Sequence, residues 1–243
     1  MAQTSSSLKN TITVLSRLVR YNLKIIFANK FIYFLAAAVT MFLIVTAINF
    51  FDANANPDEG MVYRLLLVPG ILLIFYPVTF GIQNDVDNRM IEILFGIPNY
   101  RYKVWLFRLI LIFTVTFLIL SVLATLSSLA LAPISIAGAV RQLMFPVVFL
   151  GCASFFVSTV VRNGSGTAVV MVIVGSVFTV ARDFFADHRT WDIFLNPFIL
   201  PDNVNEAAWA DIIAANRTAL FAGIVLTLLG GLLNLQKREK FLQ

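Results

Sequence analysis

Catalytic nucleophiles and metal ligands are scarce in this chain, which has one cysteine, Cys152, and one histidine, His188. Ser165 lies in a Gly-Ser-Gly setting, and a serine with a histidine on another span is the pairing of an intramembrane serine protease. One cysteine and one histidine cannot form a closed set of metal ligands. No G-x-x-x-x-G-K-[ST] phosphate loop occurs in the sequence. The short run Gly164-Ser165-Gly166-Thr167 has no lysine to bind a phosphate, and we expect a tight turn there, which its glycines permit. The sequence therefore predicts no cofactor or metal site in this chain.

The elements that would position these residues follow from the distribution of charge. Hydrophobic residues make up 59% of the 243 residues and charged residues 13%, whereas a soluble domain has about 25% charged residues. A helix crosses the hydrocarbon core with about 20 apolar residues. Six charge-free intervals meet this length, namely Phe31–Phe51, Leu65–Asn84, Leu109–Val140 with a turn near Pro133, Gln142–Val161, Asn163–Ala181 and Thr218–Gln236. The sequence thus predicts an all-helical, six-span transmembrane domain over residues 31–236.

The basic residues predict how these spans are oriented. If the N-terminus is cytoplasmic, 13 of the 18 basic residues fall on the cytoplasmic side, which carries a net +9 against −4 outside. Cytoplasmic loops are enriched in Lys and Arg, so both termini, including the tail 237–243, are expected in the cytoplasm of a bacterial or archaeal cell. This topology places Ser165 inside and His188 outside, about a membrane thickness apart. A histidine at that distance could not act as general base for the serine, which argues against an intramembrane serine protease. The net charge of +5 is the sum of two opposed faces, and no nucleic-acid partner is expected.

The cytoplasmic N-terminus, residues 1–30, contains an apolar repeat beside basic residues. The apolar positions are Leu8, Ile12, Leu15, Val19 and Ile26, and the basic ones are Lys9, Arg17, Arg20 and Lys24. This pattern is typical of an amphipathic helix that lies in the lipid headgroup layer. An ordinary positively charged leader to the first span is the alternative.

A second cytoplasmic segment, residues 85–98, lies between spans two and three. Acidic Asp85 and Asp87 come first, as suits a helix N-terminus, and Ile91, Leu94 and Phe95 form one apolar face. Gly96 and Pro98 then end the helix. A short amphipathic helix of this kind suits a groove on a soluble partner. A solvated loop that merely joins two spans is the alternative.

This segment resembles the coupling region of ATP-binding-cassette transporter permeases of the second exporter type. The matching positions are Asp85, Asp87, Glu92, Pro98, Arg101 and Arg108, while Arg89-Met90 departs from the Gly-Thr usual in the family. The residues that the resemblance implies for coupling to the ATPase are Asp85, Asp87, Arg89, Glu92, Leu94, Pro98 and Arg101. The resemblance implies a permease that works as a dimer with a second copy or a related permease, and that binds two separate ATPase subunits. ATP and magnesium would bind in those subunits. The cargo implied is lipid-like, glycan or drug-like, and a non-transporting membrane scaffold or assembly factor is the alternative function.

The transport path is expected in the spans that face each other across such a dimer, spans two and five. Hydroxyl-bearing candidates are Tyr76, Thr79, Ser176 and Thr179, which are equally ordinary interhelical contacts. Pro69 and Pro77 predict kinks in span two. The aromatic outer segment, about 183–216, is broken by Pro197 and Pro201; the family predicts re-entrant or surface helices there, and a membrane-resting loop is the alternative. No charge lies deep in any of these spans, which argues against a proton-driven carrier.

Overall fold

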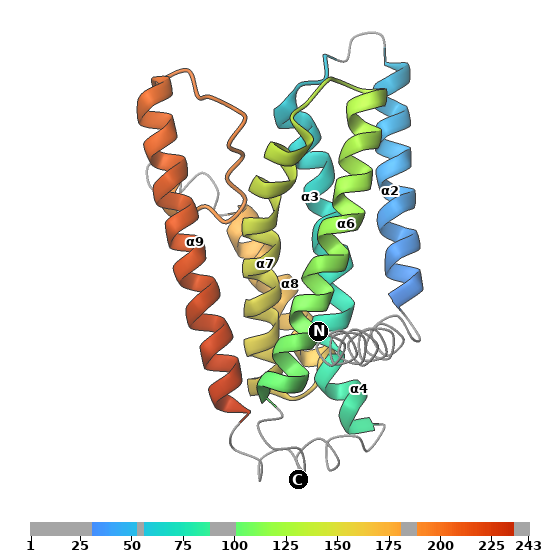
Figure 1. The fold of residues 1–243 in the computed structure, drawn as a ribbon, viewed down its shortest axis with the longest axis vertical. Coiled ribbons are helices and arrows are strands. Elements are labelled where there is room, and N and C mark those ends of the chain that lie inside the picture. Colours follow the sequence, from blue (N-terminus) through green and yellow to red (C-terminus); the bar gives the residue numbers. More distant parts are fainter. Residues whose placement is uncertain (1–30, 53–55, 88–100, 181–188, 236–243) are drawn as a thin grey trace, which may run out of the picture.

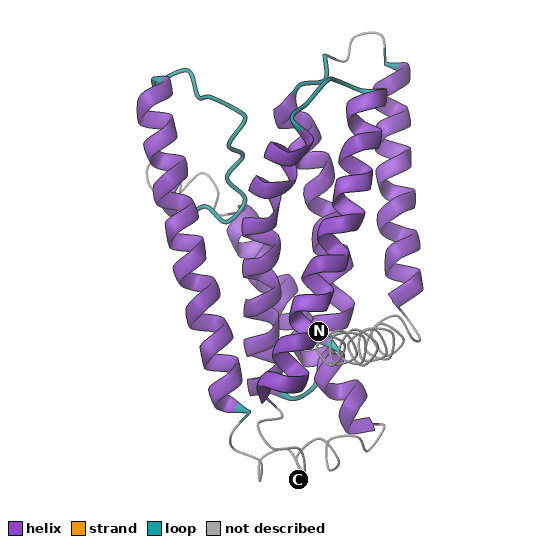
Figure 2. Ribbon diagram, viewed as in Figure 1, coloured by secondary structure: helices purple, strands orange, loops and turns teal. Residues whose placement is uncertain are grey.

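The computed structural model describes residues 31–52, 56–87, 101–180 and 189–235, and in this part of the chain every regular element is a helix. Five long helices form the bundle (Figures 1 and 2), namely α2 (Phe31–Phe51), α3 (Glu59–Thr79), α6 (Phe107–Ala130), α7 (Ile136–Val161) and α9 (Glu206–Asn234). The shorter elements are α4 (Gly81–Asp87), the π-helix η1 (Arg101–Leu106), α8 (Gly164–Val180) and the 3-10 helix η3 (Arg189–Trp191). The all-helical prediction is confirmed for the described residues, whereas the N-terminal helix predicted in 1–30 and the tail 237–243 lie outside them.

Among the described residues, five helical stretches are long and apolar enough to cross a membrane, and α8 is a shorter sixth apolar helix. The described part of α8, Gly164–Val180, has 17 residues. Residues 192–205, which precede α9, are not helical (Figure 1). The chain therefore has the architecture of a multi-pass helical membrane protein.

The helices alternate in direction, so their ends gather at two opposite sides of the bundle (Figure 1). At one side, which we call the α4 end, the Gln83 side chain accepts a hydrogen bond from Gly164 N at 2.6 Å, and Asn234 Nδ2 donates to Thr159 O at 2.7 Å. At the other side, which we call the α9-start end, Glu59 Oε1 accepts from Ser135 N at 3.1 Å.

Polar caps explain where three of the long helices begin. The side chains of Asp58, Ser135 and Asn205 accept hydrogen bonds from the backbone N–H three residues on, at the starts of α3, α7 and α9. Such caps satisfy N–H groups that the helix leaves without partners. The Asn205 cap starts α9 at Glu206, so the helix begins 12 residues before Thr218, the predicted start of the last span. The residues from Glu206 to Asn216 belong to α9, and the outer segment is correspondingly shorter than 183–216.

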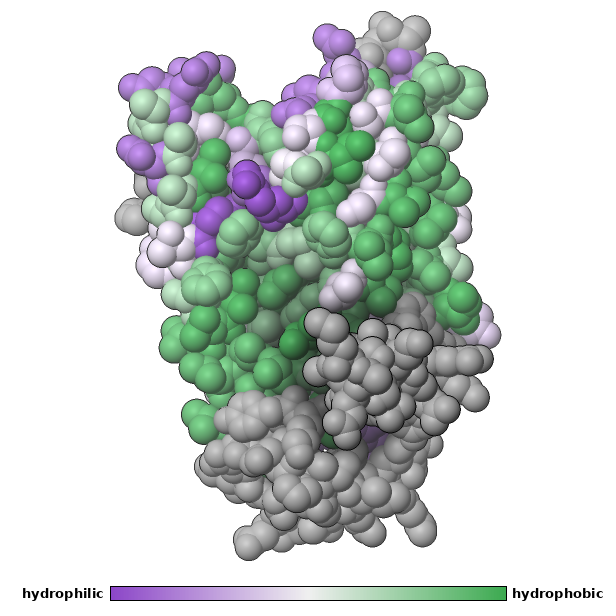
Figure 3. Space-filling view, in the orientation of Figure 1, coloured by the Kyte–Doolittle hydropathy of each residue, from purple (hydrophilic) through white to green (hydrophobic). Residues whose placement is uncertain are grey.

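The core lies where α3, α6 and α7 meet. Leu66, Leu120, Leu143 and Val147 are fully buried there. At Gly151 on α7, an added Cβ would lie 2.5 Å from the Phe113 ring, so only glycine allows these helices to come so close. The outward faces are apolar, and Figure 3 shows them as a continuous hydrophobic surface on the visible side, with hydrophilic residues gathered toward the α9-start end. This arrangement matches a surface that lies against lipid.

Span two is interrupted after its second proline. Both Pro69 and Pro77 lie inside α3, which ends at Thr79 before α4 begins at Gly81. The Thr79 carbonyl accepts a hydrogen bond from Ser158 Oγ on α7 at 3.3 Å. A hydroxyl on the neighbouring helix thus satisfies a backbone group at the break, as an apolar environment requires.

Candidate functional site

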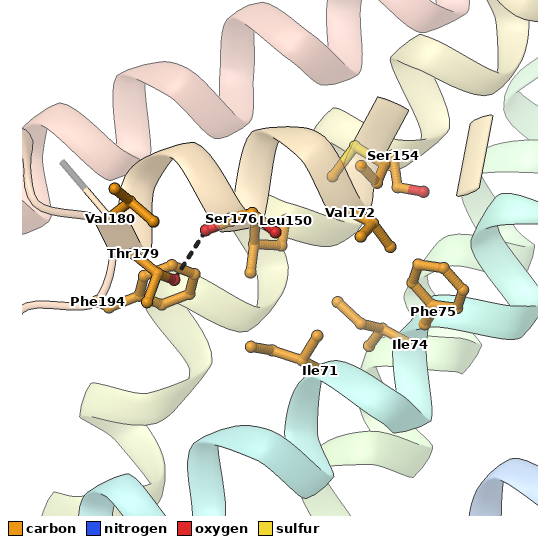
Figure 4. A pocket seen from close by; sticks show the side chains of 12 residues that line it. Ile71, Ile74, Phe75, Leu150, Ser154, Val172, Ser176, Thr179, Val180 and Phe194 are labelled. Atoms are coloured by element: carbon orange, nitrogen blue, oxygen red, sulfur yellow. Dashed lines mark hydrogen bonds between the residues drawn. The ribbon is translucent and has the colours of Figure 1, made fainter. Parts of the chain in front are cut away.

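A pocket of about 430 Å³ opens between α3, α7 and α8. Figure 4 shows Ile71 and Ile74 on α3 facing Leu150 on α7, with Val172 and Thr179 of α8 along the opposite edge. The other lining residues are Phe75, Ser154, Met171, Gly175, Ser176, Val180 and Phe194. This size is typical of small-molecule sites. None of these residues is charged, so the pocket suits an apolar or amphiphilic occupant.

Two of the three hydroxyl-bearing residues that line this pocket have hydrogen-bond partners. Thr179 Oγ1 donates to Gly175 O at 2.8 Å within α8, and Ser154 Oγ lies 2.9 Å from Thr79 Oγ1. Gly175 has nothing within 4 Å of the position that a Cβ would occupy. The wall of α8 is therefore open at this glycine, and the pocket has few polar groups left to bind a polar ligand.

The four predicted path residues do not come together at one place. Ser176 and Thr179 line the pocket, and Thr79 does not line it but shares a hydrogen bond with the lining residue Ser154. Tyr76 instead lies on the opposite face of α3, where its ring stacks on Phe34 of α2 at 5.2 Å between centroids. Ser154 was missed because it lies in span four, which the sequence gives no reason to place beside spans two and five.

At the α4 end, a buried ion pair joins α4 to α6. Arg108 Nη1 donates to Asp85 Oδ2 at 2.9 Å, and the two side chains are 6% and 3% exposed. The Arg108 guanidinium also lies over the Trp105 ring, 4.8 Å from its centroid. Both residues lie at the ends of helical stretches apolar enough to cross a membrane: Asp85 is the last residue of Glu59–Asp85, and Arg108 lies near the start of Val104–Ala130. The pair is a contact between spans rather than a solvated loop charge.

The other predicted coupling residues cannot be placed relative to this pair. Arg89, Glu92, Leu94 and Pro98 lie outside the described residues. Asp87 ends α4 and Arg101 begins η1, and only their backbones are described.

The loop between α7 and α8 differs from its prediction. Arg162 carries the left-handed conformation, with φ of 58°, whereas Gly164 and Gly166 are already in the first turn of α8. Asn163 caps that turn by accepting from Gly166 N at 3.0 Å. The turn does not require glycine at position 164. Packing requires it instead, because an added Cβ would lie 2.4 Å from the Phe80 ring.

Ser165 is exposed in that first turn, and His188 lies outside the described residues. Across the part of the chain that the structure describes, no three His, Cys, Asp or Glu side chains gather as metal ligands.

A buried polar cluster, the Arg217 cluster, lies toward the α9-start end. Asn216 is 0% exposed and Arg217 is 7% exposed on α9. Asn216 Nδ2 donates to three backbone carbonyls at 2.8–3.4 Å, those of Arg189, Thr190 and Asp192. Arg217 donates to Gln142 Oε1 and Asn216 Oδ1, both at 2.8 Å, and to Leu195 O at 3.4 Å. Arg217 is thus a buried charge inside α9, one residue before the charge-free interval that begins at Thr218.

The Arg217 cluster holds residues 189–198 inside the bundle. Ile193 and Leu195 are buried, and Asn196 Nδ2 donates to Gly60 O on α3 at 2.7 Å. Apart from η3, the described part of the outer segment before α9 is not helical. The predicted surface helices are therefore absent from residues 189–205. The alternative, a loop that rests on the membrane, does not fit Ile193 and Leu195, because both are buried in the protein. The segment is a polar-anchored insertion between α3, α7 and α9.

Comparison of the chain with protein-family models, with curated proteins and with solved structures finds no match. The described fold and its apolar surfaces define the class of the chain, which is a multi-pass helical membrane protein.

Proposed function

We propose that this chain is the transmembrane permease subunit of an ATP-binding-cassette exporter, driven by two separate ATPase subunits. The observation that carries the proposal is the Asp85–Arg108 ion pair, because its two residues flank the segment that resembles the coupling region. A force applied to residues 88–100 would pass through this pair into α4 and α6 together.

Two further contacts would extend that movement to the pocket. Gln83, just before Asp85, accepts from Gly164 N at the start of α8. Thr79, at the end of α3, shares a hydrogen bond with Ser154 in the pocket wall. Motion of α4 would therefore reach α3, α7 and α8, which are the three helices that line the pocket.

The pocket is the proposed cargo site, and its composition favours an apolar or lipid-like substrate. The outward face of α8 is apolar and exposed at Val169, Val172, Ile173 and Val177. We place a second permease copy against this face, so that two pockets would meet across the dimer. Alternating access then follows when ATP closes the ATPase pair and the coupling segments move with it.

Affinity purification of the full-length chain from membranes of its own host tests the proposal. We expect an ATPase subunit to copurify in equal amount, and the complex to hydrolyse ATP. Leu94→Asp should abolish copurification or ATP hydrolysis, because a charge on the predicted apolar face would remove the groove contact. Glu92→Lys should have the same direction of effect.

Leu200→Asp is the matched control, since it makes the same substitution at an exposed leucine in the connection before α9. It should leave copurification and hydrolysis unchanged. Copurification with no ATPase would contradict the permease role and favour a scaffold or assembly factor. Unchanged coupling in both Leu94→Asp and Glu92→Lys would contradict the role assigned to the segment.

A further inference from the structure

An open groove runs along the outside of the bundle between α9 and the neighbouring helices α6 and α7. Its lower, apolar part has a volume of about 420 Å³ and is lined by Phe117, Met144, Phe145, Val148, Phe221 and Ile224, with Arg141 at its upper limit. Its upper part, of about 430 Å³, is lined by Arg141, Gln142, Arg217 and the small face of α9 around Ala214. Arg141 and Phe145 belong to both parts, so the two are continuous.

The groove is amphipathic along its length. Hydrophilic residues appear at this place in Figure 3, in the hollow between α9 and α7 and above the apolar surface. Along α9 the lining runs from Ala210 to Ile224, which is about 21 Å at about 1.5 Å per residue, compared with a hydrocarbon core of about 30 Å. The groove therefore has a cationic upper part and an apolar lower part.

The charged residues that line the groove favour an anionic ligand. Arg141 is exposed, and it has no hydrogen bond or ion pair to any described residue. Arg217 donates to neutral oxygens, and Asp192 lies within electrostatic range of it, so Arg141 is the cation that remains available. The residues that line the two parts include no acid, and Asp211 lies about 100° around α9 from Ala210 at about 3.6 residues per turn.

We propose that this groove binds a membrane phospholipid with an anionic headgroup, with the phosphate at Arg141 and one acyl chain along Phe145, Val148 and Phe221. An arginine at the membrane interface beside an apolar groove supplies both the charge and the surface that such a lipid needs. The site lies on a different face from the α3–α7–α8 pocket and does not require that the chain be a transporter.

Native mass spectrometry of the purified, delipidated full-length chain tests the site. Phosphatidylglycerol and phosphatidylcholine with identical acyl chains are added, and the retained lipid is counted. We expect about a fivefold preference for phosphatidylglycerol, the size expected for one basic residue at an anionic surface. Arg141→Gln should remove the preference, and Val148→Trp, which fills the apolar part, should lower retention of both lipids alike. Inorganic phosphate should not displace the lipid, because it has no acyl chain.

Arg64→Gln is the matched control. Arg64 is also an exposed arginine, the sixth residue of α3 as Arg141 is the sixth of α7, and it lines neither part of the groove. It should leave the preference intact. Equal losses in Arg64→Gln and Arg141→Gln would show general surface attraction and overturn the site, as would an unchanged preference in Arg141→Gln. Because the measurement uses no ATPase, its failure leaves the proposed transport function untouched.

Discussion

Asp85 and Arg108 are held together at 2.9 Å in the interior of the α4 end, although 22 residues of the chain separate them. Arg108 also stacks on Trp105, one turn earlier, so its guanidinium is fixed between an acid and a ring. The two ends of the segment that resembles a coupling region are therefore locked to one another, whatever that segment binds.

Removing one partner of this pair should be strongly destabilising. Asp85→Asn leaves a buried guanidinium without its counter-charge, which costs about 3–5 kcal/mol when one partner of a buried pair is lost. The measurement is the fraction of monodisperse protein that survives heating in detergent. Asp211→Asn, at an exposed acid on α9, is the control and should change little.

The double variant Asp85→Leu with Arg108→Met should recover most of that loss, because apolar residues of similar volume often replace a buried ion pair without cost. If the double variant were as unstable as Asp85→Asn, the charges themselves, rather than the contact between α4 and α6, would be required for folding.

The fold was predictable where apolar length alone decides the structure. The first span ends at Phe51, as the sequence predicts, because no charge or cap interrupts the helix before that residue. For α9 the charge-free interval Thr218–Gln236 indicates only the later part of the helix, which begins after the Asn205 cap and includes Arg217. A buried arginine becomes acceptable only when Gln142 and Leu195, distant in sequence, supply acceptors.

The candidate site was predictable only in part for a related reason. Ser176 and Thr179 were found because α8 presents them to α3, whereas Tyr76 is turned toward α2 by its contact with Phe34. Which face of a uniformly apolar helix meets which neighbour depends on packing, and periodicity carries little information about it.

Filling the pocket from α8 should block function and leave folding intact. Gly175→Leu projects a side chain into open space, and loss of a mid-helix glycine stabilises a helix by about 0.5–1 kcal/mol. We expect normal yield and heat resistance, with loss of cargo-stimulated ATP hydrolysis in the purified complex.

Gly151→Leu is the contrasting variant on α7. Its side chain would collide with the Phe113 ring, so we expect a marked loss of folded protein from overpacking, typically about 1–3 kcal/mol. Full cargo stimulation in Gly175→Leu would show that the pocket is not on the transport path.

Asn216→Asp should release the outer segment from the bundle. The substitution conserves shape but replaces an amide that donates to three carbonyls of residues 189–192 with an acceptor. Buried groups left unsatisfied cost about 1–3 kcal/mol each. Hydrogen exchange measured by mass spectrometry should rise in residues 189–198 and remain unchanged in α6.

Asn49→Asp provides the comparison for that variant, because Asn49 donates only to Val45 O in its own helix α2. It should leave exchange in residues 189–198 as in the unaltered chain. Equal protection in Asn216→Asp would mean that Asn216 is not what anchors the segment.

The orientation of the chain can be tested with single cysteines. Cys152 is 1% exposed, so the unaltered chain should not react with a membrane-impermeant maleimide and serves as the blank. Because 13 of the 18 basic residues fall on the side predicted to be cytoplasmic, Asn99→Cys should be labelled in inside-out vesicles and protected in right-side-out ones. Asp202→Cys, in the connection before α9 at the opposite end of the bundle, should show the reverse pattern. Labelling of Asn99→Cys from the outer face would reverse the topology, and it would remove residues 88–100 from the reach of any cytoplasmic ATPase.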